Sequence, residues 1–361
     1  MTAATVEVTG GVVAGADALA GRDEAGWPRV TVAILAFNRR DALRLTLTKT
    51  LTELDYPARA LDVIVVDNAS TDGSAEMVAA EFPSVGLIRM ERNVGVAGIN
   101  QAFAVAKGEW CLSLDDDCWI DGPLLKLAVA AAEANRADLA SFLVRSGPQA
   151  DSYFNQAYTM GLFGFWGCAV LLSRRALEQL GGYDPHIFIY GNEVEFTMRL
   201  LDAGLRHLYL PEVVAVHMKP TPDEDAQLRA YATNLRHWSY TAAKLLRLPD
   251  ALRVIGRLTT AILLDVVAKT PHAATSLPAV LAGARDGWRV RRPVRAEVSA
   301  IYRDHFVSFA NPVTFLRTPR QRWRARRDPS HRRDDAESRL DAFRQARGTY
   351  YPTTSAGVLE I

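Results

Sequence analysis

Short apolar runs alternate with segments of helical periodicity along the first third of the chain. The runs at residues 30–36, 61–66, 85–89 and 110–114 have the length and composition of buried strands. Between them, apolar residues recur at helical spacing at 43–54, 74–81 and 97–107, and Asp41 is placed to cap the first of these helices. Strands that alternate with helices through short links predict a mainly parallel sheet with helices on both faces.

The pattern continues to about residue 220 and then changes. A helix is predicted at 123–135, a strand at 139–144, a glycine-rich aromatic stretch with a strand at 161–172, a helix from 192 that Gly204 ends, and a short strand at 206–210, which the segment 211–217 follows. Amphipathic helices at 223–247, 252–270 and 276–288 follow. We therefore expect a loosely ordered leader at 1–28, an α/β domain at 29–220 and a helical, Arg-rich extension at 221–361.

Charge and cysteine usage add expectations about partners and compartment. The 361 residues carry 42 basic and 41 acidic side chains, but arginines crowd the end from 285 to 347. This basic end is either a solvated helix face or a contact for an anionic partner, such as a membrane surface or a phosphorylated acceptor. The extension could lie on anionic lipid, form a homodimer or cap the acceptor cleft. Nucleic acid is a weaker candidate because no base-reading module accompanies the charge.

The three cysteines form no CxxC pair, and the chain shows neither a secretion signal nor an apolar run long enough to cross a bilayer. We expect a cytoplasmic protein, in contact with the inner membrane face at most.

Polar side chains and glycines follow each predicted strand. In chain order they are Phe37, Asn38 and Arg39, then Asp67 and Asn68, then Arg92, Asn93 and Gly95, and finally Asp115, Asp116 and Asp117. Ligands of parallel sheets lie beyond the carboxyl ends of the strands, so these residues predict one binding edge. The full GxGxxG pattern of dinucleotide sites is absent.

The run of three aspartates suggests a cation site. Asp115 and Asp117 alternate to one side of an extended chain, so both can reach one divalent ion through oxygen. Such an ion would keep coordination positions for a diphosphate. The alternative is a solvated acidic turn.

Four segments in fixed order resemble the family 2 glycosyltransferases, which are inverting enzymes of the GT-A fold. They read ILAFNRR, VVDNASTDGS, NVGVAGINQAFAVAKGEW and LSLDDD, and the resemblance extends over roughly residues 30–220. The second and third are most similar to rhamnosyltransferase-like and galactofuranosyltransferase-like members. The resemblance implies an enzyme that moves a sugar from a UDP- or dTDP-linked donor to a hydroxyl acceptor, with Mn²⁺ or Mg²⁺ as cofactor.

The resemblance also implies roles for individual residues. His217 would complete the metal site of Asp115 and Asp117. Glu193, in the segment Asn192-Glu193-Val194-Glu195, stands where the family carries its general base, usually an Asp. The donor would contact Leu35, Phe37, Asn38, Arg39, Asp67, Asn68, Arg92, Asn93, Gly95, Asp115 and Asp116, and the acceptor would contact Trp166, Gly167 and Glu195.

Each of these roles has a structural alternative. Trp166 could be a core aromatic residue, Glu193 and Glu195 could only favour the start of a helix, and His217 could be structural. Two other functions stay open. A sugar nucleotidyltransferase would carry a glycine-rich loop after the first strand, which Phe37-Asn38-Arg39-Arg40 is not. A non-catalytic binding protein could keep the same fold.

Overall fold

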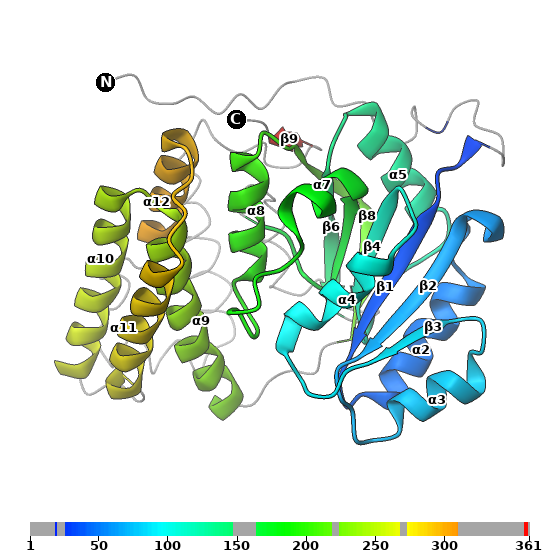
Figure 1. Cartoon of the computed structure of the whole chain (residues 1–361), viewed down its shortest axis with the longest axis horizontal. Coiled ribbons are helices and arrows are strands. Elements are labelled where there is room, and N and C mark those ends of the chain that lie inside the picture. The colour runs from blue at the N-terminus through cyan, green and yellow to red at the C-terminus, as the bar shows by residue number, and fades with distance from the viewer. Residues whose placement is uncertain are drawn as a thin grey trace, which may run out of the picture. The chain divides into compact units, whose positions relative to one another are not determined.

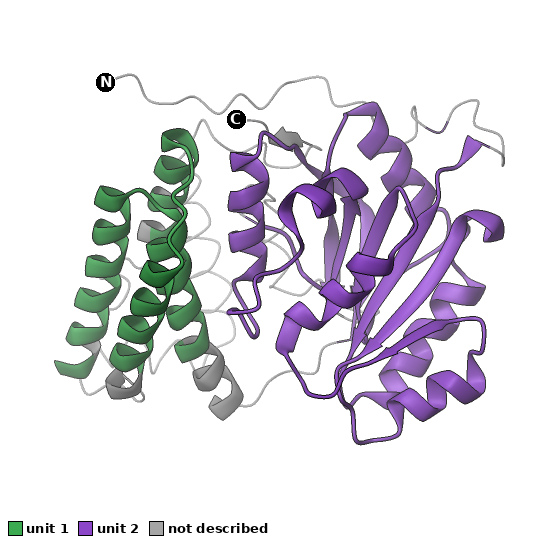
Figure 2. Ribbon diagram, viewed as in Figure 1, with its two compact units in different colours: residues 1–4, 222–351 green, residues 5–221, 352–361 purple. Residues whose placement is uncertain are grey.

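The computed structural model describes residues 19, 26–146, 164–218, 224–267, 273–309 and 357–359. Most of the predicted leader and the Arg-rich end beyond residue 309, apart from 357–359, lie outside the described residues. The chain divides into two compact units (Figure 2). One comprises Thr5–Thr221 with Pro352–Ile361, and the other comprises Met1–Ala4 with Pro222–Tyr351.

The larger unit is built on one mixed sheet flanked by helices (Figure 1). In the described residues its strand order is β3-β2-β1-β4-β7-β6-β8-β5, and β9 pairs with β8. The strands are β1 (Val30–Ala36), β2 (Leu61–Asp67), β3 (Gly86–Arg89), β4 (Trp110–Asp115), β5 (Cys118–Ile120), β6 (Leu139–Ser146), β7 (Ala169–Ser173), β8 (His207–His217) and β9 (Gly357–Leu359). The helices are α2 (Arg40–Thr52), α3 (Ser74–Glu81), α4 (Asn100–Val105), α5 (Leu124–Ala134), α7 (Arg174–Leu180) and α8 (Asn192–Asp202).

The strand directions explain where the site lies. The pairs β1–β2, β1–β4, β2–β3 and β6–β8 are parallel, whereas β4–β7, β5–β8, β6–β7 and β8–β9 are antiparallel. Because β1, β2 and β4 are parallel neighbours, Leu35, Asp67 and Asp115 come to the same edge of the sheet. The predicted α/β class is confirmed, but the sheet is mixed rather than mainly parallel. The strands of the first four apolar runs are parallel to one another, and β6 and β8 form one further parallel pair.

The hydrophobic core accounts for the alternating pattern in the sequence. One face of β1 is completely buried through Val30, Val32 and Ile34. It packs in a common core with Leu43 and Leu47 of α2. Residues of α3 and α5 join the same core, so these three helices share a core with one face of the sheet.

Some local predictions were wrong or incomplete. Asp41 is not the N-cap of α2; Arg39 takes that position without a side-chain cap, and Asp72 Oδ2 accepts the Arg40 N–H at 2.8 Å instead. The helix predicted at 97–107 is limited to α4, after a 3₁₀ turn at Gly95–Ile99. The elements β5, α7 and α12 were not predicted. Residues 207–217 form the single strand β8. The register of its pairing with β6 shifts between Phe142 and Leu143, where the partner changes from Leu210 to Val214. Pro211 lies in this interval, and proline has no N–H to donate to a neighbouring strand.

The smaller unit is helical. It contains α9 (Glu224–Leu245), α10 (Leu248–Val267), α11 (Ala273–Arg289) and α12 (Ala296–Phe309). Pro249 lies in the first turn of α10, where proline is tolerated. Helix α10 exposes Leu248, Leu252, Leu263, Leu264, Val266 and Val267. Among the helices that the structure describes, none has the length and apolar character needed to cross a bilayer.

Candidate active site

A cavity of about 360 Å³ opens at the carboxyl ends of β1 and β4. Many of the predicted site residues line it: Leu35, Phe37, Arg39, Asn68, Asn93, Gly95, Asp115, Asp116, Trp166, Gly167, Glu193 and His217. The cavity lining does not include Asn38, Asp67, Arg92, Asp117 or Glu195. The sheet therefore brings together residues that are up to 182 positions apart, from Leu35 to His217.

Three side chains converge as a group that fits a divalent cation. One ligand atom from each of Asp115, Asp117 and His217 lies within 4.8 Å of the others. The short strand β5 is responsible, because it pairs Cys118 with His217 on β8 directly after the aspartates. His217 Nε2 lies 3.0 Å from Asp117 Oδ1 and 4.0 Å from Asp115 Oδ2. Two carboxylates and an imidazole suit Mn²⁺ or Mg²⁺.

The protonation of His217 reflects the charge of this group. Burial lowers its pKa, but hydrogen bonds and charge interactions with Asp117 and Cys168 outweigh burial and raise the pKa to about 10. The raised pKa favours an imidazolium at His217, whose charge balances part of the negative charge of Asp115 and Asp117.

Asp116 contacts the turn that follows β1. Its Oδ2 accepts the Phe37 N–H at 3.0 Å, and its Oδ1 lies 3.3 Å from Arg39 Nη1. Thr46 Oγ1 donates to the Asp116 carbonyl at 2.9 Å. Burial, together with neighbouring carboxylates, raises the pKa of Asp116 to about 7 despite these donors. Asp116 therefore fixes the turn between β1 and α2 as well as lining the cavity.

Asn68 organises the loop at the opposite rim. Its Nδ2 donates to Asn93 Oδ1 at 2.9 Å and to the Gly95 carbonyl at 3.0 Å, while its Oδ1 accepts the Val94 N–H at 3.1 Å. Gly95 has φ +70°, and a Cβ there would lie 2.0 Å from the Phe188 carbonyl oxygen. Glycine is thus required for the close approach of this loop to the segment before α8.

The predicted donor residues outside the cavity have other surroundings. Asn38 Oδ1 accepts the Thr71 N–H at 2.7 Å, which joins the turns after β1 and β2. Asp67 is buried behind the lining; its Oδ2 accepts the Ser70 N–H at 3.3 Å, and its Oδ1 has no hydrogen-bond partner among the described residues. Arg92 is exposed.

Glu193 faces the cavity from the first turn of α8. Burial, and to a smaller extent the charge of Asp115, raises the pKa of Glu193 to about 7, although the N–H groups of Glu193, Gly191 and Gly167 donate to its carboxylate. A Cβ on Gly167 would lie 2.9 Å from Glu193 Oε1, so a larger residue at 167 would displace this carboxylate. A carboxylate whose pKa lies near neutrality suits proton transfer.

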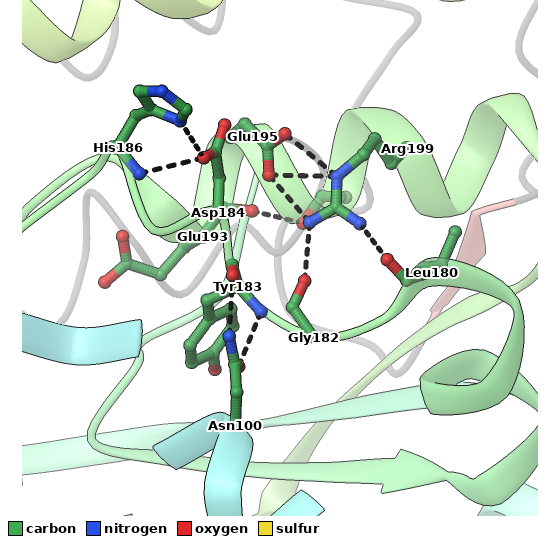
Figure 3. Close-up of polar contacts among 10 residues, drawn as sticks. Asn100, Leu180, Gly182, Tyr183, Asp184, His186, Glu193, Glu195 and Arg199 are labelled. Carbon is green, nitrogen blue, oxygen red and sulfur yellow. Dashed lines mark hydrogen bonds and ion pairs between the residues drawn. The ribbon is translucent and has the colours of Figure 1, made fainter. Parts of the chain in front are cut away.

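Glu195, predicted as an acceptor residue, does not line the cavity. It is completely buried and forms an ion pair with Arg199 one turn later, with Nη2 2.8 Å from Oε2. Arg199 also donates to the carbonyls of Leu180 at 2.8 Å and Gly182 at 2.7 Å. Figure 3 shows Glu193 and Glu195 leaving α8 in different directions. Glu195 therefore holds α8 against the end of α7.

The segment that precedes α8 supplies lining residues that were not predicted, including Tyr183, Phe188 and Tyr190. Tyr183 is fixed by Asn100, which accepts its N–H at 2.9 Å and donates to its carbonyl at 2.8 Å (Figure 3). The adjacent Gly182 has φ +86°, and a Cβ there would lie 2.4 Å from Asn100 Oδ1. The Gly181-Gly182-Tyr183-Asp184 motif was the available signal for this segment.

Trp166 lies between the cavity and the hydrophobic core. Its side chain lines the cavity, and it also packs against the main hydrophobic core. Trp166 thus offers an aromatic wall whose position the core fixes.

Comparisons with known proteins identify what the chain is similar to. The model of the family described as glycosyl transferase family 2 matches residues 31–195. An N-acetylglucosaminyl-diphospho-decaprenol L-rhamnosyltransferase of Mycobacterium tuberculosis is 26% identical over 207 residues, which cover 45% of this chain and 67% of the relative. The glycosyltransferase AglE of Haloferax volcanii is 27% identical over 214 residues, covering 53% of this chain and 67% of the relative.

A solved structure shows the same fold. The mannosyltransferase PcManGT from Pyrobaculum calidifontis, in complex with GDP-Man and Mn²⁺, superposes with a TM-score of 0.51 at 21% identity. The match covers 83% of this chain and 88% of that chain. The predicted GT-A fold is therefore confirmed. Residues 31–195 therefore match glycosyltransferase family 2, and the similarity to its enzymes indicates a glycosyltransferase.

Proposed function

We propose that the chain is a metal-dependent, inverting glycosyltransferase that moves a sugar from a UDP- or dTDP-linked donor to a hydroxyl group. One observation carries this proposal: the group of Asp115, Asp117 and His217 adjoins the same cavity as Glu193. A donor diphosphate and an acceptor hydroxyl need these two kinds of site next to each other.

The acidic group would hold Mn²⁺ or Mg²⁺ through Asp115, Asp117 and His217. When bound, the cation supplies positive charge to the departing diphosphate. Asp115 is half exposed in the cavity, whereas Asp117 is buried behind it. A cation bound to Asp115 could thus also contact a donor in the cavity.

Glu193 would accept the proton of the acceptor hydroxyl. Its raised pKa matches a base that works near neutral pH. A hydroxyl activated by Glu193 would attack the sugar carbon from the face opposite the diphosphate, which inverts the anomeric configuration. Trp166 and Gly167, next to Glu193 in the lining, would receive the acceptor.

The other side of the cavity suits the donor nucleoside. Leu35 and Phe37 would flank the base. Asn68 is a better candidate than Asp67 for contact with the base edge because Asn68 lines the cavity and its Oδ1 keeps a second acceptor position.

A panel of nucleotide sugars tests the proposal. Donor hydrolysis and thermal stabilisation are measured with UDP-glucose, UDP-galactose, UDP-N-acetylglucosamine and dTDP-rhamnose, each with Mn²⁺ and with EDTA. We expect at least one donor to stabilise the protein only with Mn²⁺. A scaffold would show no metal-dependent binding, and a nucleotidyltransferase would instead join a sugar phosphate to a nucleoside triphosphate.

The rate of transfer is expected to rise with pH, to reach half of its maximum near the Glu193 pKa of about 7, and to level off about one pH unit higher. Burial raises the pKa of Glu193 to about 7, so at lower pH the carboxyl group is protonated and cannot accept the hydroxyl proton. Initial rates at saturating substrates from about pH 5 to 9 measure this effect, with nucleotide binding at each pH as the control. A rate that does not change between about pH 5 and 7 while binding is constant would refute Glu193 as the base.

We also propose that the helical unit contacts an anionic membrane. Six apolar side chains of α10 are exposed, with Arg253 exposed on the same helix. The relative from Mycobacterium tuberculosis is named for a decaprenol-linked acceptor, which supports an acceptor at a lipid surface.

Co-sedimentation with vesicles tests this contact. We expect the protein to bind phosphatidylglycerol vesicles better than phosphatidylcholine vesicles, and Leu252→Glu with Leu263→Glu to reduce binding about tenfold or more. Leu45→Glu, on an exposed leucine of α2, is the matched control. The membrane contact would be contradicted if the double variant still bound the vesicles. It would also be contradicted if the double substitution dissociated a dimer and left vesicle binding unchanged.

A further inference from the structure

Arg39 places a guanidinium group inside the acidic cluster. Its Nη1 forms an ion pair with Asp117 Oδ2 and lies 3.3 Å from Asp116 Oδ1. The Arg39 side chain is 41% exposed, whereas the side chains of Asp116 and Asp117 are 8% and 3% exposed. Arg39 therefore reaches two buried carboxylates from the open side of the cavity, which it also lines.

This position affects the cation site directly. Asp117 Oδ2 pairs with Arg39, and Asp117 Oδ1 lies 3.0 Å from His217 Nε2. Both oxygens of one expected metal ligand thus face positively charged or protonatable groups. A divalent cation that coordinates Asp117 would come close to the Arg39 guanidinium and be repelled by it.

Arg39 also has an alternative partner once a donor is present. Guanidinium groups bind phosphate oxygens through paired hydrogen bonds. Arg39 lines the same cavity as Asp115, and its backbone lies in the turn before α2. Its side chain can therefore exchange a carboxylate for a diphosphate without the movement of a helix.

We propose that Arg39 is an exchangeable counter-ion of the metal site: it competes with the divalent cation for Asp117 in the empty cavity and transfers to the donor diphosphate when the nucleotide binds. The inference rests on the proposed function, because it takes the diphosphate as the second partner. Its consequence is that Arg39 couples the two ligands, so that cation binding is weak alone and strong with nucleotide.

The neighbouring Arg40 provides a matched control. It carries the same charge one residue later, but its side chain pairs with Asp41 at 3.3 Å and it is not part of the cavity lining. A general effect of removing one positive charge near the site would therefore appear in both arginines. An effect of the Arg39 contact would appear in Arg39 alone.

The experiment is a titration of the full chain with Mn²⁺, followed by electron paramagnetic resonance, without nucleotide and with saturating UDP. For Arg39→Met we expect the Kd for Mn²⁺ without UDP to fall about tenfold, and the factor by which UDP tightens Mn²⁺ binding to shrink by a similar amount. Arg40→Met should change neither quantity more than about twofold. Arg39→Lys keeps the charge and should lie between the wild type and Arg39→Met.

The outcomes separate this inference from the proposed function. An unchanged or weaker Mn²⁺ affinity in Arg39→Met, or equal effects of both arginines, would overturn the exchange. If the melting curve shows that Arg39→Met is unfolded, the intermediate values expected for Arg39→Lys decide in the same way. If the wild type binds Mn²⁺ but neither UDP nor dTDP, the proposed donor is wrong, and the titration without nucleotide still tests the competition for Asp117.

Discussion

Replacing Glu193 by Gln is expected to lower the rate of sugar transfer about a thousandfold while nucleotide binding persists. The amide keeps the size of the side chain and its place beside Gly167, but it cannot accept a proton. The measurement is kcat with the donor found in the panel, together with the Kd of the matching nucleoside diphosphate. Undiminished turnover would remove Glu193 from the mechanism.

The folding stability of Glu193→Gln provides a second readout. Burial raises the pKa of Glu193 to about 7, so between its ordinary value and pH 7 the folded state binds more protons than the unfolded state. The contribution of Glu193 to stability therefore falls as pH rises through this window. Glu193→Gln removes that loss and should be at least as stable as the wild type at about pH 8.

Glu195→Gln is the matched control, because the same substitution two residues later breaks the ion pair with Arg199. We expect it to lower the free energy of unfolding by about 3 kcal/mol, since Arg199 loses its buried partner. The kcat of the folded Glu195→Gln protein should equal that of the wild type, because Glu193 is unchanged. If Glu195→Gln lost kcat about a thousandfold without a lower melting temperature, Glu195 rather than Glu193 would be the base.

Replacing Asp117 by Asn is expected to weaken Mn²⁺ binding about a hundredfold and to abolish metal-dependent donor binding. Asp117 is the buried member of the metal group, and it lies 3.0 Å from His217 Nε2. An amide removes one negative ligand and leaves the arrangement of β4, β5 and β8 in place. The Kd for Mn²⁺ and the nucleotide Kd with and without Mn²⁺ measure the effect.

Asp121→Asn controls for a general loss of negative charge. Asp121 follows the same aspartates, is exposed, and is not a member of the metal group. It should bind Mn²⁺ and the donor as the wild type does. An unchanged metal profile in Asp117→Asn, or equal losses in both variants, would count against the assigned cation site.

The sequence indicated much of the fold because local patterns carry it. The apolar runs at β1, β2 and β4 and the helical spacing of α2 and α3 depend on burial of neighbouring side chains, which periodicity records. The aspartates at the end of β4 were recognisable as a site because they follow a predicted strand, and parallel strands end at one edge of the sheet. The short strand β5 carries too few residues for a periodic signal, and α7 lacked an assigned pattern.

The site divides in the same way. The sequence by itself determined the α/β class, the family segments and the carboxylates that follow β4. Only the tertiary structure decided that β5 aligns His217 with those carboxylates, that Glu193 faces the cavity while Glu195 pairs with Arg199, and that Arg39 occupies the acidic cluster. The physical reason is that strand spacing and helix periodicity are local, whereas the direction and partner of a charged side chain depend on distant segments that only the folded chain brings together.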